Sequence, residues 1–164
     1  PILLGSYIAG SLLKDKDASI LLCEVGLQAN PHDPTLLNNI IYELATSDNL
    51  EGANKYINQI KEINISSLPN ESKVTIQATL GLVALRNKEF EIGKKLYELA
   101  IENSERIKND YLFNLAVVNY ARELCIANQP EKEKYLDIVL KMQLDDKHKD
   151  LIELRKETLE YKKE

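Results

Sequence analysis

One pattern, found twice at a constant offset of 40 residues, constrains this chain more than any other feature. Apolar residues recur at spacings of three and four, the period of an α-helix, and no useful length alternates as a β-strand does. In the first copy, Asp33 and Pro34 indicate a helix start, and the turn-forming residues 47–49 separate two helices. Two helices joined by so short a break lie antiparallel. The pairs at this offset are Ile40 and Leu80, Ile41 and Gly81, Leu44 and Ala84, Leu50 and Phe90, Ala53 and Gly93, Ile57 and Tyr97, and Ile60 and Ala100.

This repeat predicts an all-α fold built of antiparallel helical hairpins. Generic amphipathic helices do not reproduce large and small residues at one fixed offset. The 164 residues, 44% of them hydrophobic, suffice for one domain with a core. Six Gly and five Pro are too few for a turn-rich β fold or a low-complexity chain.

The second copy carries a Leu-Gly pair in its first helix and small, aromatic and small residues along its second: Leu80, Gly81, Gly93, Tyr97 and Ala100. This pattern resembles the tetratricopeptide repeat (TPR) family, and the chain is similar to bacterial TPR-containing proteins. The resemblance implies an α-solenoid, a superhelix of stacked hairpins, that acts as a protein-binding scaffold. The first copy departs from the pattern, because Ile41 stands in place of the glycine.

The resemblance divides residues 1–164 into four units and a terminal helix. Cys23 stands where the first unit would have an aromatic residue, and the second helix of the fourth unit, 130–142, lacks the small-aromatic-small series. The charged last segment has leucines on one side, which predicts a polar cap for the end of the array. In the fourth unit, four residues fit the first-helix positions if that helix runs on to Ala127: Leu112, Leu115, Ala116 and Asn119. The predicted boundaries are 2–33 (its first helix at about 2–13), 34–67, 74–107 and 110–143, with the capping helix at about 146–163.

The small and aromatic positions of the second helices are explained by packing, so a binding surface is expected on the first helices. In the family, one stripe of each first helix lines a concave groove. Carried over to this sequence, the stripe predicts three sets of groove residues: Thr35, Asn38, Asn39, Tyr42 and Thr46; Thr75, Ala78, Leu82, Leu85 and Arg86; and Phe113, Val117 and Tyr120.

The predicted groove is apolar toward the fourth unit and carries few charges. Family members that grip a C-terminal carboxylate place basic residues on successive first helices, but those positions hold Leu4, Ile8, Ala78 and Leu82, which contradicts such a clamp. Three interpretations stay open. The groove receives an apolar or amphipathic segment of a partner; it is covered by the chain's own terminal helix or by a second copy; or the stripe is misregistered and belongs to the core.

Charge and cysteine usage narrow the expected setting. The net charge of −5, with mixed signs along the chain, argues against a nucleic-acid partner. The longest apolar runs are too short to cross a membrane. Cys23 and Cys125 lie in apolar runs and form no disulfide framework, so a reducing, cytoplasmic setting is expected. The start on Pro1 is expected of an excerpt from a longer chain.

Residues with catalytic or metal-binding chemistry are sparse. His32 and His148 have no companions at metal-ligand spacing, and no nucleophile motif or phosphate-binding glycine loop occurs. We therefore expect no enzymatic activity, no cofactor and no metal. Two functions remain. The first is a module that binds a peptide or helix of a partner protein in an apolar concave groove. The second is a structural or oligomerisation segment of a larger protein, whose groove is covered by its own terminal helix or, in a homodimer, by a second copy.

Overall fold

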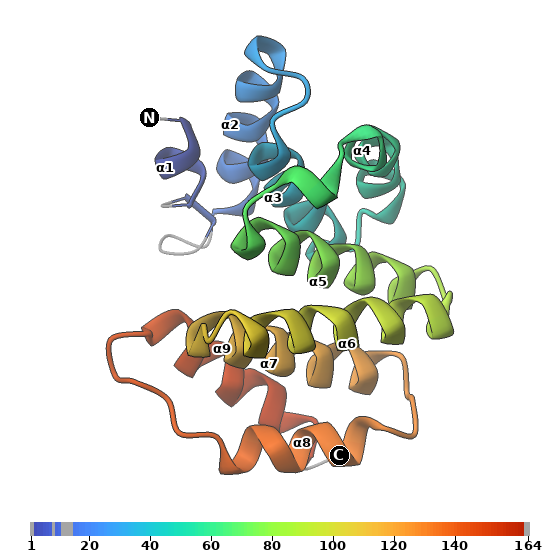
Figure 1. Ribbon diagram of the computed structural model, residues 1–164, viewed down its shortest axis with the longest axis vertical. Helices are drawn as coiled ribbons and strands as arrows, with labels where there is room; N and C mark the ends of the chain where they lie inside the picture. The colour runs from blue at the N-terminus through green and yellow to red at the C-terminus, as the bar shows by residue number, and fades with distance from the viewer. Residues whose placement is uncertain (1, 8, 11–14, 163–164) are drawn as a thin grey trace.

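The computed structural model describes residues 2–7, 9–10 and 15–162, and within these ranges it is all-helical with no strand. The predicted all-α class is confirmed (Figure 1). Residue 8 and the end of the predicted first helix, 11–13, lie outside the described residues. The elements are α1 (Ile2–Tyr7), α2 (Lys16–Ala29), α3 (Pro34–Thr46), α4 (Leu50–Glu62), the 3-10 turn η2 (Ile65–Ser67), α5 (Asn70–Arg86), α6 (Phe90–Arg106), α7 (Asp110–Ile126), α8 (Lys132–Lys141) and α9 (Lys149–Glu160).

Several helix ends follow from local chemistry. Asp33 caps α3 as predicted, because its Oδ1 accepts bonds of 3.0 Å from the backbone N–H groups of Thr35 and Leu36. Helix α5 begins at Asn70, earlier than the predicted unit boundary at residue 74, because the chain turns into the helix at Pro69. Helix α7 runs to Ile126, as the fourth-unit pattern requires. Helices α8 and α9 are both shorter than predicted.

The turns that follow α3, α5 and α7 repeat at an interval of 40 residues. Each places a residue in the left-handed region directly after the helix: Asp48 (φ 58°), Lys88 (φ 64°) and Asn128 (φ 48°). The next N–H in each case bonds back across the last turn, from Asn49 to Leu44, from Glu89 to Ala84 and from Gln129 to Leu124. The same turn also follows α6, where Lys108 has φ 54° and the Asn109 N–H bonds to the Ser104 carbonyl. This turn therefore ends four helices of the described chain and does not by itself mark the 40-residue period.

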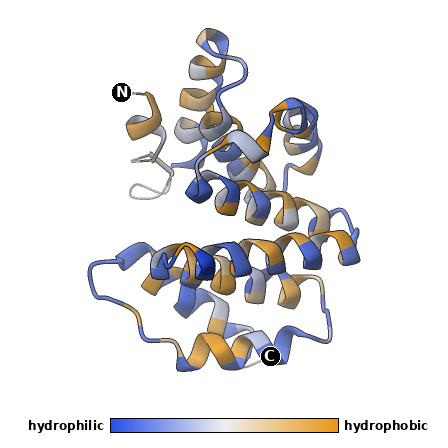
Figure 2. Ribbon diagram, in the orientation of Figure 1, coloured by the Kyte–Doolittle hydropathy of each residue, from blue (hydrophilic) through white to orange (hydrophobic). Residues whose placement is uncertain are grey.

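Helices that are neighbours in sequence pack together, and α3, α5, α7 and α9 also pack on one another in that order. Helix α6 packs on both α5 and α7, and α8 packs on both α7 and α9. In Figure 1, α6 runs beside α5 in the middle of the molecule and α8 lies at the bottom. Figure 2 shows hydrophobic and hydrophilic residues alternating in short runs along the helices, as expected when one face of each is buried.

Three tyrosines connect α6, α7 and α8 in the core. The rings of Tyr97 and Tyr120 stack with centroids 4.8 Å apart, and the Tyr135 ring is tilted against Tyr120 at 4.5 Å. Both Tyr97 and Tyr120 are buried. This explains why an aromatic stands at position 97: it fills the space between α6 and α7 rather than facing solvent.

Candidate binding cavity

A cavity of about 560 Å³ lies against α3, α5, α7 and α9. Three sets of lining residues fall at positions 38, 39, 42, 43 and 46 of α3, at 74, 75, 78, 79 and 82 of α5, and at 111, 112, 115, 116 and 119 of α7. The rest of the lining outside α9 is made by Ser6, Gly10, Lys16, Ser19, Tyr97 and Arg122. The second set follows the first by 36 residues, and the third follows the second by 37. Offsets of 36 and 37 are four and three residues shorter than the interval of 40, and one helical turn takes 3.6 residues. The lining therefore lies on the same face that the interval of 40 selects, about one turn nearer the N-terminus on α5 than on α3, and again on α7 than on α5.

Seven of the predicted groove residues line this cavity, all of them on α3 and α5: Asn38, Asn39, Tyr42, Thr46, Thr75, Ala78 and Leu82. Their exposures differ. Leu82 is only 1% exposed and belongs to the floor, whereas the other six are partly exposed. Thr35 is exposed outside the cavity.

Two further predicted residues, Leu85 and Arg86, lie beyond the end of the cavity. Leu85 is buried against Gly93 of α6. Together with Arg86 it borders a second hollow of about 340 Å³ at the turns. The predicted groove therefore extends one turn farther along α5 than the cavity does. The last turn of α5 instead contacts the turn after α3 and the end of α7.

On α7 the cavity-lining register differs from the predicted one by a single residue. Phe113 packs against the core, and Val117 and Tyr120 are buried in it. A shift of one residue rotates a side chain by about 100° around the helix. The positions that face the cavity are Leu112, Leu115, Ala116 and Asn119, the same ones that fit the first-helix pattern.

The far wall of the cavity comes from α9. Its lining residues are Asp150, Glu153, Leu154 and Glu157. Asp150 accepts a 2.7 Å hydrogen bond from the Tyr111 hydroxyl, and Arg155 donates to the carbonyls of Val139 and Leu140 on α8 at 2.9 and 2.7 Å. These bonds hold α9 against α7 and α8. The terminal helix thus forms a wall of the cavity and leaves its interior open, which no sequence signal indicated.

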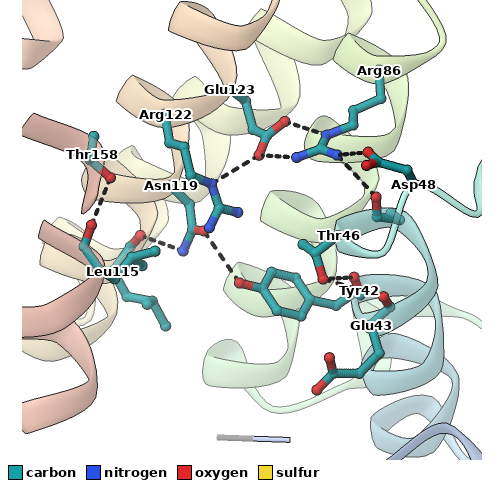
Figure 3. Close-up of polar contacts among 12 residues, drawn as sticks. Tyr42, Glu43, Thr46, Asp48, Arg86, Leu115, Asn119, Arg122, Glu123 and Thr158 are labelled. Atoms are coloured by element: carbon teal, nitrogen blue, oxygen red, sulfur yellow. Dashed lines mark hydrogen bonds and ion pairs between the residues drawn. The ribbon is translucent and has the colours of Figure 1, made fainter. Parts of the chain in front are cut away.

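Polar groups from α3 and α7 meet at one side of the cavity (Figure 3). The Tyr42 hydroxyl donates to Asn119 Oδ1 at 3.5 Å, and Asn119 Nδ2 donates to the Leu115 carbonyl at 3.0 Å. Arg122, which the sequence analysis did not single out, also lines the cavity. Its Nε donates to Glu123 Oε1 at 3.1 Å.

Arg86 ties together the ends of α3, α5 and α7 (Figure 3). It donates to Glu123 through Nε at 2.7 Å and through Nη2 at 3.1 Å, and through Nη1 to the Ala45 carbonyl at 3.1 Å and Asp48 at 3.0 Å. The hydrogen bond to Glu123 raises the pKa of Arg86, against the opposing effect of burial. The Glu123 side chain is fully buried, so this pair defines how the three helices meet.

Glu43 lines the α2 side of the cavity, where the charge of Lys16 acts on it. The Glu43 carboxylate accepts a 3.4 Å bond from the Ser19 hydroxyl. Burial raises its pKa above the ordinary value of 4.5, and the charge of Lys16 only partly offsets this. The folded state therefore holds the Glu43 proton more tightly than the unfolded chain does.

We predict that Glu43→Gln flattens the dependence of stability on pH. With a folded-state pKa above the unfolded one, Glu43 costs no stability at low pH and lowers stability as pH rises past 4.5 through its raised pKa. The variant should equal or exceed the parent in free energy of unfolding at neutral pH and lose that advantage in acid. Urea unfolding at a series of pH values measures this. A variant that grows less stable relative to the parent as pH rises contradicts it.

Other sequence features have simple positions in the described part of the chain. Cys23 and Cys125 are free thiols, and burial raises the pKa of each. His148 packs its ring against Tyr111 at 4.7 Å. Among the residues described, no three His, Cys, Asp or Glu side chains gather as a metal site, and no helix is long and apolar enough to cross a membrane.

Comparison of the chain with known proteins gave no match to a family model, to a curated protein or to a solved structure. In the part of the chain that the structure describes, the fold and the site define an all-helical protein in which α3, α5, α7 and α9, every second helix, each turn one face toward a shared cavity.

Proposed function

We propose that this chain is a protein-interaction module, a TPR-like α-solenoid that binds a short segment of a partner protein in the cavity between α3, α5, α7 and α9. The observation that carries the proposal is the lining itself, which takes the same face of α3, α5 and α7 at offsets of 36 and 37 residues. In this reading α9 is the cap that closes the array.

The chemistry of the lining supports a peptide as the occupant. Apolar side chains of α5 and α7 form its floor, including Leu82, Leu112 and Ala116. Amide side chains of α3, Asn38 and Asn39, stand beside them and can hydrogen-bond a peptide backbone. A volume of about 560 Å³ falls within the range of sites that enclose a small ligand, so the cavity suits a few residues of an extended segment better than a long helix.

Blocking the cavity tests this proposal. Ala78 lies in the lining and is partly exposed, so Ala78→Trp places an indole in the cavity without removing a core side chain. Ile92 on α6 is 57% exposed and lies outside the lining, so Ile92→Trp is the matched control. Random peptides displayed on phage are selected on the unmodified chain, and the selected peptides are synthesised and titrated against each variant.

We expect Ala78→Trp to weaken binding by about tenfold or more, equivalent to about 1.4 kcal/mol, and Ile92→Trp to leave it unchanged. Thermal unfolding of both variants checks that each remains folded. If selection yields no binding peptide, or the peptides bind Ala78→Trp as well as the unmodified chain, the proposal is wrong.

A second candidate function, oligomerisation, is favoured by apolar side chains exposed on the first two helices. Leu4 of α1 is 62% exposed, and Leu21 and Val25 of α2 are 60% and 45% exposed. Leu21 and Val25 lie one turn apart on α2, and exposed apolar groups that lie close together mark contact surfaces. Light scattering separates the two candidates: a dimer that Leu21→Glu returns to monomer supports oligomerisation through α2, and a monomeric unmodified chain contradicts it.

A further inference from the structure

Helix α9 brings a row of acidic side chains to the wall of the cavity. Asp150, Glu153 and Glu157 all line it, and their spacings of three and four residues place them on one face of the helix. The buried residues Leu151 and Thr158 mark the neighbouring face, which packs into the protein. The lysines and arginine of α9 are absent from the described lining. The wall that α9 forms is therefore negatively charged.

The two basic side chains of the described lining act on acids outside α9. Lys16 donates to the Thr46 carbonyl at 2.9 Å, and its charge acts on Glu43. Arg122 donates to the buried carboxylate of Glu123 at 3.1 Å. Neither of these contacts involves an acid of α9. Because the described lining holds four acidic and two basic side chains, its negative charge exceeds its positive charge, and the excess lies on the α9 side.

Two separate features of the lining suit an occupant that supplies N–H donors. The carboxylates of α9 are open to a ligand, because Glu153 and Glu157 are exposed, whereas the side chain of Arg122 is only 14% exposed. On α3, the Oδ1 atom of Asn38 is buried in the lining and has no hydrogen-bond donor. An amide oxygen accepts hydrogen bonds, so an N–H group of the occupant satisfies it.

We propose that the cavity binds a partner segment whose lysine or arginine side chain faces α9 and whose apolar neighbours rest on the floor, an inference that rests on the proposed function. In an extended segment successive side chains point to opposite sides, so a basic residue and its flanking residues reach different walls. Asp150 and Glu157 lie seven residues apart, about 10 Å along the helix, and offer the cation a row of carboxylates. The same charges disfavour an acidic segment.

Matched peptides test the proposal without knowledge of the natural partner. Four tripeptides with acetylated and amidated ends carry Lys, Arg, Gln or Glu between two leucines, so that only the central side chain differs. Each is titrated into the isotope-labelled chain while NMR follows the methyl groups of Leu154 and the side-chain amide of Asn119. We expect the Lys or Arg peptide to bind about threefold or more tightly than the Gln peptide, as a partly exposed ion pair implies, and the Glu peptide to bind most weakly. This preference should shrink at about 1 M salt, which screens exposed charges.

Variants then assign the effect to α9. Glu153→Gln combined with Glu157→Gln removes two charges from the wall. Glu105→Gln combined with Glu160→Gln is the control, because both of these residues are exposed, lie outside the lining and change the net charge by the same amount. The preference for the basic peptides should disappear in the first variant and persist in the second. Glu157→Lys should shift the preference toward the Glu peptide, a reversal that loss of folding does not produce.

Four results would overturn the inference: equal binding of basic and neutral peptides, no saturable shift with any peptide, a basic preference that survives the loss of both charges at Glu153 and Glu157, or binding of n-butylamine as tight as that of the Lys peptide. The last result would mean that the wall takes a free amine rather than a peptide. Phage-selected peptides that Ala78→Trp blocks, but that are not enriched in basic residues, would refute the role of α9 and leave the proposed function standing. Failure of Ala78→Trp to block them would refute the proposed function itself.

Discussion

Replacing Glu123 with Gln is expected to lower the free energy of unfolding by about 3–5 kcal/mol, the cost of leaving buried charges without their partner. Glu123 is the fully buried carboxylate between Arg86 and Arg122, and Gln keeps its shape while removing its charge. Two guanidinium groups would then face each other with no buried anion between them. Urea unfolding at neutral pH measures the change, with Glu102→Gln on the exposed face of α6 as the control.

A double-mutant cycle of Glu123→Gln and Arg86→Gln measures the interaction free energy between these two side chains, apart from their contacts with other residues. The double variant should lose less stability than the two single losses added together, because each single change leaves a buried charge that the other removes in part. A loss in Glu123→Gln no larger than that in Glu102→Gln would show that α3, α5 and α7 do not meet through this pair.

Gly93→Ala is expected to destabilise the chain by about 1–3 kcal/mol, the usual cost of overpacking a core. A Cβ at Gly93 would lie 2.6 Å from Leu85 Cγ and 2.9 Å from the Leu85 backbone nitrogen, so α5 and α6 must separate to admit it. This penalty opposes the gain of up to about 1 kcal/mol that Ala offers over Gly inside a helix. Thermal or urea unfolding reports the net change, and Gly93→Val should lose more.

Gly5→Ala is the control, because its Cβ would meet Leu22 Cδ1 at an ordinary 3.4 Å. That variant should be neutral or slightly stabilised. The Gly93→Ala result also decides between the effect expected from the structure, which is destabilisation, and the effect expected from the TPR resemblance. The TPR pattern has Ala at the position of Gly93, so the resemblance alone predicts a harmless or stabilising change. A stabilised Gly93→Ala would mean that α5 and α6 lie farther apart than the structure shows.

Local chemistry was readable from the sequence because it acts over a few residues. The Asp33 cap, the break after Thr46 and the start of α6 at Phe90 all fall where the residues predict them. These features depend on hydrogen bonds and backbone preferences within one turn of helix. The turns at Asp48, Lys88 and Asn128 are also spaced by 40 residues, but the same turn at Lys108 falls between them, so the repeat of hairpins stays a prediction.

The candidate site was only partly predictable, and the errors have a common cause. The lining of α3 and α5 could be placed because the two copies carry clear patterns. On α7 the apolar positions are so numerous that the stripe facing the core and the stripe facing the cavity look alike. Phe113, Val117 and Tyr120 were therefore predicted as groove residues. Asn119 was placed in the first-helix pattern but not in the groove, and Arg122 was not singled out.

The two features with the largest consequences came from contacts between distant segments. Arg86 and Glu123 are separated by 37 residues, and Tyr42 and Asn119 by 77, so neither pairing carries a local signal. The wall that α9 adds to the cavity likewise depends on how that helix docks against α7 and α8.

The all-helical class, the Asp33 cap and the start of α6 at Phe90 were determined by the sequence alone, because they follow from hydrogen bonds and apolar spacing within single turns. The face of α7 that meets the cavity, the pairing of Glu123 with both Arg86 and Arg122, and the open interior beside α9 were decided only by the tertiary structure. Burial and charge balance at these places depend on which helices come together, and a rotation of about 100° about one helix axis is enough to change both.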